Sequence, residues 1–154
     1  MALGALSLAL LLGALGFQYI GGIPPCEMCH WQRWPHIASI AIGLGGGFLV
    51  ARGALPAPLA WPLAWATVAL VSLGGALGVY HAGVEWHWWP GPQACTGPAF
   101  RYSGGALNLN AHVVLCDVAA WRLFGLSLAG YNAVISLGAA LVGARSLLRG
   151  GDAR

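Results

Sequence analysis

Four cysteines carry the clearest chemical signal in this chain of 154 residues: Cys26, Cys29, Cys95 and Cys116. Cys26 and Cys29 are separated by two residues, a spacing that brings two sulfur atoms together in a short loop at the start of a helix. Because the thiolate is the reactive form of cysteine and a helix N-terminus stabilises negative charge, this pair is a candidate redox dithiol. Cys95 and Cys116 lie 21 residues apart, and a structural disulfide that braces a loop is one interpretation of them.

The spacing of Cys26 and Cys29 also fits other kinds of protein. Followed by His30, the pair matches the C-x-x-C-H motif for covalent haem, which would make the protein a membrane-bound c-type cytochrome. Haem would leave Cys95 and Cys116 without a role. A zinc site of four cysteines is the weakest alternative, because these two lack the close spacing of typical zinc ligands. A non-enzymatic protein with four membrane spans and structural disulfides is the remaining alternative.

The elements that position the cysteines follow from the scarcity of charge. Hydrophobic residues make up 58% of the chain and charged residues 7%, whereas an ordinary soluble domain carries about 25% charged residues. This composition excludes a water-soluble monomer and a disordered chain. A net charge of +3 without any lysine also excludes a nucleic-acid binder, because no basic patch can form. We therefore expect an integral membrane protein, in contact with membrane lipid, with one domain over residues 1–154.

Uncharged windows long enough to cross a bilayer predict four membrane-spanning helices. Proline and glycine fall where the windows end, and the eight tryptophans lie near the predicted ends, as is typical of membrane interfaces. The first window lacks a basic start, so we expect a retained span rather than a cleaved signal peptide. The predicted fold is an all-α membrane protein, a four-helix bundle with a long loop between the third and fourth helices. We expect the spans at about residues 2–20, 34–51, 59–80 and 123–144.

Four spans place both termini on one side of the membrane and the loops 21–33 and 81–122 together on the other. All four cysteines fall in these two loops. Four arginines on the terminus side against three on the loop side favour cytoplasmic termini. The cysteines would then face an oxidising compartment, where disulfides persist. Proline and glycine flank Cys95, so we expect this residue to be mobile and exposed.

Arg33 is the charged residue best placed to assist the cysteines. It follows Cys29 by four residues, so both lie on one helix face if the helix already covers this turn. Its guanidinium could stabilise a thiolate or the oxygen of a bound electron acceptor. An ionisable group at the membrane boundary is costly and is often functional. Gln32 could orient Arg33 or donate a hydrogen bond.

Small and polar residues inside the predicted spans are explained by packing. Small residues four positions apart let helices approach closely in lipid, and polar groups inside a bundle pair with one another. We therefore expect His36 and Asn132 to be satisfied within the bundle rather than catalytic. The glycine pairs are Gly43 with Gly47 and Gly74 with Gly78.

The chain resembles the DsbB family of membrane thiol:quinone oxidoreductases. The resemblance covers essentially the whole chain, with the four spans in the same order. In relatives of vitamin K epoxide reductase the C-x-x-C follows the loop cysteines, whereas here it precedes them, and this order favours DsbB. The matching stretches are residues 25–33 (PCEMCHWQR), 89–95 (WPGPQAC), 116–121 (CDVAAW) and 124–127 (FGLS).

The resemblance implies a function and a location. It implies that the protein oxidises a DsbA-like periplasmic thiol oxidase by disulfide exchange and passes the electrons to ubiquinone or menaquinone. It further implies a bacterial inner membrane with periplasmic cysteine loops. For the cysteines, it implies that Cys95 is attacked by the partner's thiolate, that Cys116 is its disulfide partner, and that Cys26 exchanges with Cys116.

The resemblance also implies which residues bind the quinone. Cys29 would face the quinone, and Arg33 would lie near the quinone oxygen. The family has a histidine near the quinone, for which His81 is the nearest candidate. Gln32 stands where bacterial members commonly carry glutamate, and we count it among the expected quinone-binding residues.

Overall fold

The computed structural model of the protein describes residues 1–96 and 114–151. Four helical segments in this part of the chain are long and apolar enough to cross a membrane, so the predicted all-α membrane fold is confirmed. The only strands in the described part are two short ones, which pair as an antiparallel hairpin. The elements are α1 (Ala2–Tyr19), α2 (Glu27–Ser39), the π-helical turn η1 (Ile40–Gly46), α3 (Gly47–Ala51), the 3₁₀ turn η2 (Ala57–Leu59), α4 (Ala60–Glu85), β1 (Arg122–Leu123), β2 (Leu126–Ser127) and α5 (Leu128–Gly151).

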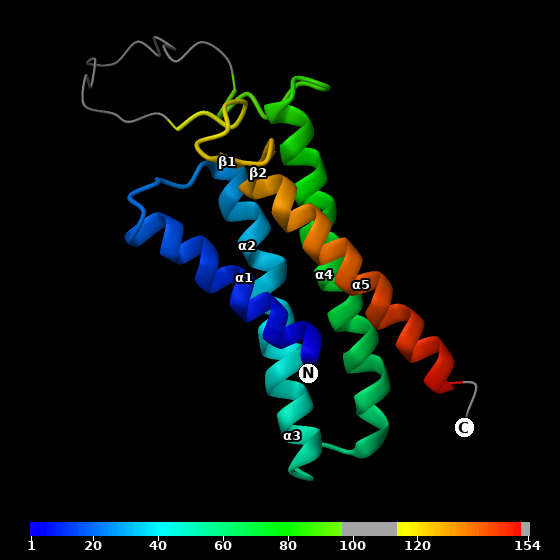
Figure 1. Cartoon of the computed structure of the whole chain (residues 1–154). Helices are drawn as coiled ribbons and strands as arrows, with labels where there is room; N and C mark the ends of the chain where they lie inside the picture. Colours follow the sequence, from blue (N-terminus) through cyan, green and yellow to red (C-terminus); the bar gives the residue numbers. More distant parts are fainter. Residues whose placement is uncertain (97–113, 152–154) are drawn as a thin grey trace.

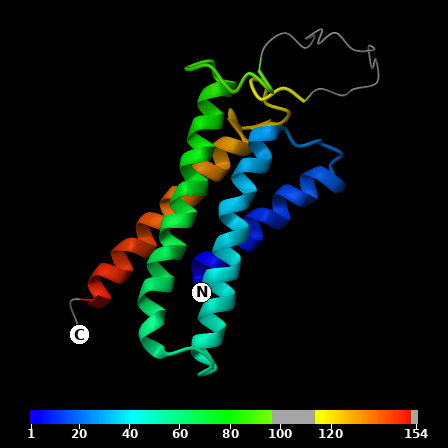
Figure 2. The same ribbon diagram turned by 180° about the vertical axis from the view of Figure 1, so that it is seen from behind.

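The helices form a bundle in which α4 packs against both α5 and α2, and α1 packs against α2 and η1. The loop before α2, the end of α4 and the β1–β2 hairpin lie together at one end of the bundle (Figures 1 and 2). The start of α1 and the end of α5 lie toward the opposite end in both views. The described cysteine segments therefore come together at one end, as the four-span arrangement predicts.

Glycine allows the close helix contacts that the sequence predicts. A Cβ atom on Gly78 of α4 would lie 2.9 Å from Ala129 O and from Ala133 N of α5. A Cβ atom on Gly43 would lie 3.2 Å from Gly4 Cα and 2.8 Å from a methyl group of Thr67. The backbones of neighbouring helices thus approach more closely than any larger residue would permit.

Four helix ends differ clearly from the predicted spans, and one is the end of the fourth helix, which reaches Gly151 rather than residue 144. The second helix begins at Glu27 rather than near residue 34, because the Cys26 side chain accepts the Cys29 N–H and Glu27 favours the first turn electrostatically. The third continues past residue 80 to Glu85, so His81 belongs to a helix rather than to the loop. The uncharged windows mark only the apolar length of each helix.

The fourth helix begins at Leu128 rather than at residue 123, because the β1–β2 hairpin occupies the preceding residues. The two residues at its turn, Phe124 and Gly125, have φ values of 50° and 83°. Such a pair of left-handed residues matches a tight hairpin turn and is incompatible with a right-handed helix.

Candidate redox site

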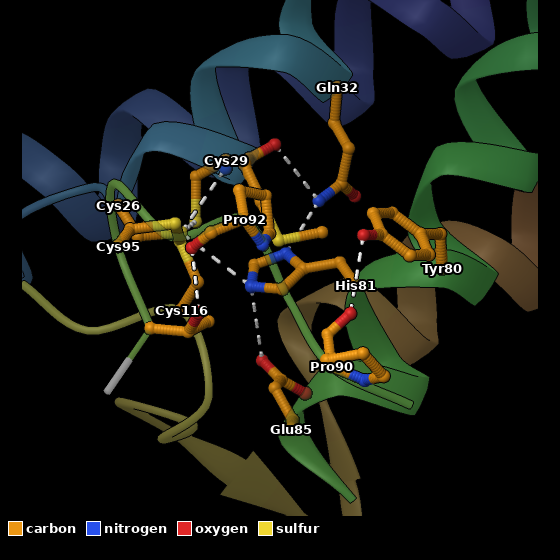
Figure 3. Close-up of a disulfide and its surroundings, with 12 residues drawn as sticks. Cys26, Cys29, Gln32, Tyr80, His81, Glu85, Pro90, Pro92, Cys95 and Cys116 are labelled. Carbon is orange, nitrogen blue, oxygen red and sulfur yellow. Dashed lines mark hydrogen bonds and ion pairs between the residues drawn. A yellow bond between two sulfur atoms is a disulfide. The ribbon is translucent and has the colours of Figure 1, made fainter. Parts of the chain in front are cut away.

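The C-x-x-C pair occupies the N-terminus of α2. Cys26 is the residue that caps this helix, and its Sγ atom accepts the backbone N–H of Cys29 at 3.2 Å. The two Sγ atoms are 2.7 Å apart, closer than ordinary packing of sulfur atoms, and both thiols are free (Figure 3). Cys26 is buried and Cys29 is half-buried. The pair can therefore pass between dithiol and disulfide with little movement of the helix.

The two thiols of the pair are not equivalent. The pKa of Cys26 is raised above its ordinary value, first by its hydrogen bond with the Cys29 side chain, then by burial and by the charge of Cys29. Cys26 therefore holds its proton in the reduced pair. The Cys29 sulfur shares that hydrogen bond at the start of a helix, where negative charge is stabilised.

Cys95 and Cys116 form a disulfide with a Cα–Cα distance of 5.3 Å. The expectation that Cys95 is exposed is wrong, because only 5% of it is accessible and Cys116 is fully buried. Both pack in one cluster with Cys26 and Val84, and the Cys116 N–H donates to Cys95 O at 2.7 Å. The disulfide that the family resemblance implies is thus present, and all four cysteines meet at one site.

The His81 side chain projects from α4 into the cysteine cluster. Its Nε2 atom lies 3.6 Å from Cys26 Sγ and 3.7 Å from Glu85 Oε1, one turn along α4. Its Nδ1 atom lies 2.7 Å from Gln32 Nε2. Figure 3 shows the His81 ring between Gln32 and Glu85, with the cysteines beside it. Gln32 also contacts Asn132 on α5, so it is part of a buried polar network rather than a partner of Arg33.

Arg33 lies on the same face of α2 as Cys29, because the helix already covers this turn. Its Nη1 atom donates to Gln18 Oε1 on α1 at 2.8 Å. Its Nε atom is buried and has no hydrogen-bond partner among the described residues. Gln18 was not predicted from the sequence; a polar residue near the end of an apolar span is the signal that could have found it.

His36 and Asn132 are satisfied within the bundle, as the sequence predicts. His36 Nε2 lies 3.0 Å from Asn132 Oδ1, and His36 Nδ1 lies 3.2 Å from the Ser7 hydroxyl. Asn132 therefore links α5 to α2 deep between the helices.

A cavity of about 370 Å³ opens beside the C-x-x-C pair. Its walls come from α1, α2, α4, α5 and the segment that follows residue 114, and most of its lining is apolar. Its volume is within the range of small-molecule sites, in which a few polar groups orient an otherwise apolar ligand. The polar side chains that line it include Cys29, Gln32, Arg33, His81 and Glu85.

The cysteine arrangement also bears on metal binding. Cys26, Cys29 and His81 offer three ligand atoms that lie within 4.8 Å of one another. The disulfide between Cys95 and Cys116 rules out the four-cysteine zinc site in this state, because disulfide sulfurs are not thiolate ligands.

A family model described as "Disulfide bond formation protein DsbB" matches residues 1–145. The chain belongs to the DsbB family. No curated protein and no solved structure matches the chain. As a DsbB-family protein, it is a multi-pass membrane oxidoreductase of disulfide bond formation.

Membership in the DsbB family bears on the alternatives that the C-x-x-C-H spacing leaves open. The match spans both cysteine pairs and most of the four helices. The haem interpretation, which rests on His30 after Cys29, is therefore left without support. The same is true of the interpretation in which the disulfides are purely structural. His30 is exposed.

Proposed function

We propose that this protein oxidises a periplasmic thioredoxin-like partner, of the DsbA type, and passes the electrons to membrane ubiquinone or menaquinone. The observation that supports this proposal best is the position of the cysteines. The Cys95–Cys116 disulfide packs against Cys26, and Cys26, Cys29 and Arg33 line the apolar cavity. The cluster thus connects a disulfide in the loop to a site for an apolar electron acceptor.

The cavity residues fit a quinone, which is an apolar ring with carbonyl oxygens. When bound, a quinone supplies a two-electron acceptor. The buried Arg33 Nε has a hydrogen that no described residue accepts, and a carbonyl oxygen would satisfy it. Cys29 would face the ring, while Gln32 and His81 would complete the polar end of the site.

Electrons would move through the cysteines by successive exchanges, each of which breaks one S–S bond and forms another. The partner's thiolate attacks Cys95, and Cys116 leaves as a thiolate. Cys116 then attacks Cys26 of an oxidised C-x-x-C pair, and Cys29 leaves. The partner's second thiolate then attacks the disulfide between the partner and Cys95, which releases the oxidised partner and the Cys95 thiolate. Cys95 attacks Cys116, which restores the Cys95–Cys116 disulfide, releases Cys26 and leaves the free dithiol that is seen in the structure.

The proposal includes an orientation in the bacterial inner membrane. With cytoplasmic termini, the cysteine end of the bundle faces the periplasm, where the thiol partner is oxidised. The excess of arginine on the terminus side supports this orientation. We also propose that residues 1–154 form one membrane domain.

The test uses purified protein in detergent, a reduced DsbA-like protein and a soluble quinone analogue. We expect loss of quinone absorbance that depends on the thiol partner. Cys29→Ser should abolish it, because the C-x-x-C disulfide can no longer form. Ser72→Ala is the control and should retain activity, because among the described residues this hydroxyl bonds only to Val68 O of its own helix. Unchanged turnover in Cys29→Ser would rule out the proposed electron path.

A further inference from the structure

A hydrogen-bonded chain of three side chains crosses the bundle and ends at the cysteines. Asn132 Nδ2 on α5 lies 2.8 Å from Gln32 Oε1 on α2. Gln32 Nε2 lies 2.7 Å from His81 Nδ1 on α4. The opposite ring nitrogen, His81 Nε2, faces Cys26 Sγ at 3.6 Å. Gln32 and His81 are buried, so water does not compete readily for these bonds.

Backbone carbonyls set the direction of the hydrogen bonds in this chain. Gly74 O lies 3.1 Å from the Asn132 amide, and Met28 O lies 3.4 Å from the Gln32 amide. A carbonyl oxygen only accepts, so the amide atom that faces it must be the NH₂ group in both residues. Asn132 Oδ1 is then left to accept from the Ser136 hydroxyl at 2.9 Å and from His36 Nε2.

The direction of the chain determines where His81 carries its proton. Asn132 donates to Gln32 Oε1, and Gln32 Nε2 donates to His81 Nδ1. A ring nitrogen that accepts a hydrogen bond has no proton, so the proton of the neutral ring is on Nε2. From there it faces Cys26 Sγ, Glu85 Oε1 and the backbone of Cys116.

We infer that Asn132 and Gln32 are positioning residues that hold His81 in the Nε2–H tautomer, with this proton directed at the Cys26 sulfur. Asn132 acts from another helix and through Gln32. Its role is therefore to orient the donor rather than to take part in the disulfide exchange.

The consequence for the reaction rests on the proposed function. When the Cys95 thiolate attacks the mixed disulfide between Cys116 and Cys26, the Cys95–Cys116 bond forms and the Cys116–Cys26 bond breaks. The electron pair of the broken bond remains on Cys26 Sγ. The His81 Nε2–H donates a hydrogen bond to this leaving thiolate and speeds its departure, because a stabilised leaving thiol departs faster. The proton stays on the ring.

Nitrogen NMR of the full-length protein, labelled with ¹⁵N-histidine, reduced and held in detergent micelles, tests the tautomer. We expect a protonated Nε2 and an unprotonated Nδ1 for His81, and the signals missing from His81→Gln identify the residue. Gln32→Glu places a carboxylate against Nδ1 and should move the proton to that atom. Asn132→Leu removes the donor to Gln32 Oε1 and leaves only the longer bond to Met28 O to orient the Gln32 amide, so the Nδ1–H form of His81 should become populated beside the Nε2–H form.

Ser136→Ala is the matched control for Asn132→Leu. It removes a partner of Asn132 Oδ1 but leaves the bonds to Gly74 and Gln32, so we expect an unchanged His81 tautomer. A proton on Nδ1 in the unaltered protein, or a tautomer change in Ser136→Ala, would overturn the inference.

A kinetic measurement tests the consequence for exchange. We expect Asn132→Leu to slow disulfide transfer from the C-x-x-C pair to the loop cysteines by about tenfold, the effect of losing one hydrogen bond to a charged group. A rate equal to that of the unaltered protein would contradict the role of His81 in exchange. The NMR measurement needs neither quinone nor partner. A result that contradicts the inferred His81 tautomer can therefore be told apart from a result that contradicts the proposed function.

Discussion

Arg33 on α2 donates a hydrogen bond of 2.8 Å to Gln18 on α1, at the cysteine end of the bundle. This bond holds the guanidinium beside the apolar cavity, while the buried Nε remains unpaired among the described residues. An uncompensated buried donor costs free energy, so its retention favours a ligand that uses it. Two helices that the sequence separates by a loop thus jointly define the polar end of the cavity.

Replacement of Arg33 by methionine should weaken quinone binding. We expect Arg33→Met to raise the KM for quinone by about tenfold or more, because a charge-assisted hydrogen bond contributes about 1.5–3 kcal/mol. Gln18→Met should raise it less, since the guanidinium is retained but released from α1. The measurement is the initial rate of quinone reduction over a range of quinone concentrations.

Arg52→Met is the matched control for the loss of positive charge. Arg52 lies at the other end of the bundle, over the Phe48 ring, and we expect its replacement to leave the KM unchanged. Equal effects of the two arginine replacements would show that Arg33 acts only through net charge.

The raised pKa of Cys26 predicts slow alkylation of this thiol near neutral pH. Because a raised pKa keeps the thiol protonated, the reactive thiolate should appear only under alkaline conditions. Cys29→Ala removes the hydrogen bond and the charge of Cys29 but keeps the burial, so the midpoint of the alkylation profile should move to lower pH.

This profile is best measured by mass spectrometry with Cys95 and Cys116 replaced by serine, so that the loop cysteines do not react. The midpoint of the profile reports the ionisation of the thiol, whereas limited access of the reagent lowers the alkylation rate at every pH. An unshifted midpoint in Cys29→Ala would show that burial alone controls Cys26.

The contact between α4 and α5 should be sensitive to one added methyl group. Gly78→Ala would place Cβ 2.9 Å from backbone atoms of α5, so we expect a loss of about 1–3 kcal/mol in the free energy of unfolding. Gly138→Ala on α5, where a Cβ would meet no atom within 4 Å, is the control and should not destabilise the protein. Thermal unfolding in detergent compares the two, and equal loss in both variants would contradict close packing at Gly78.

Gln32 should also oppose metal binding at the reduced cysteines. A histidine that binds a metal through Nε2 carries its proton on Nδ1 and needs an acceptor there, whereas Gln32 presents a donor. Gln32→Glu should therefore tighten Zn²⁺ binding by about tenfold or more. Competition with a chromophoric chelator measures this, and Gln18→Glu, which adds a carboxylate beside Arg33 instead, should not reproduce the gain.

Several features of the protein follow from the sequence because they depend on local spacing and composition. The scarcity of charge predicts the membrane and the number of spans, and these spans predict that both cysteine pairs lie at one end. The four-residue spacing of Cys29 and Arg33 predicts a shared helix face. Each of these inferences needs only the helical repeat and the thickness of a bilayer.

The tertiary structure decided which side chains meet across helices. Proline and glycine around Cys95 indicate a mobile segment, yet packing against Cys26 and Cys116 buries it. No sequence spacing relates Gln18 to Arg33, or Asn132 to Gln32, because these pairs join different helices. Sequence periodicity describes the faces of one helix, whereas the direction of a buried hydrogen bond depends on how neighbouring helices rotate and pack. The tautomer of His81 is a property of that packing alone.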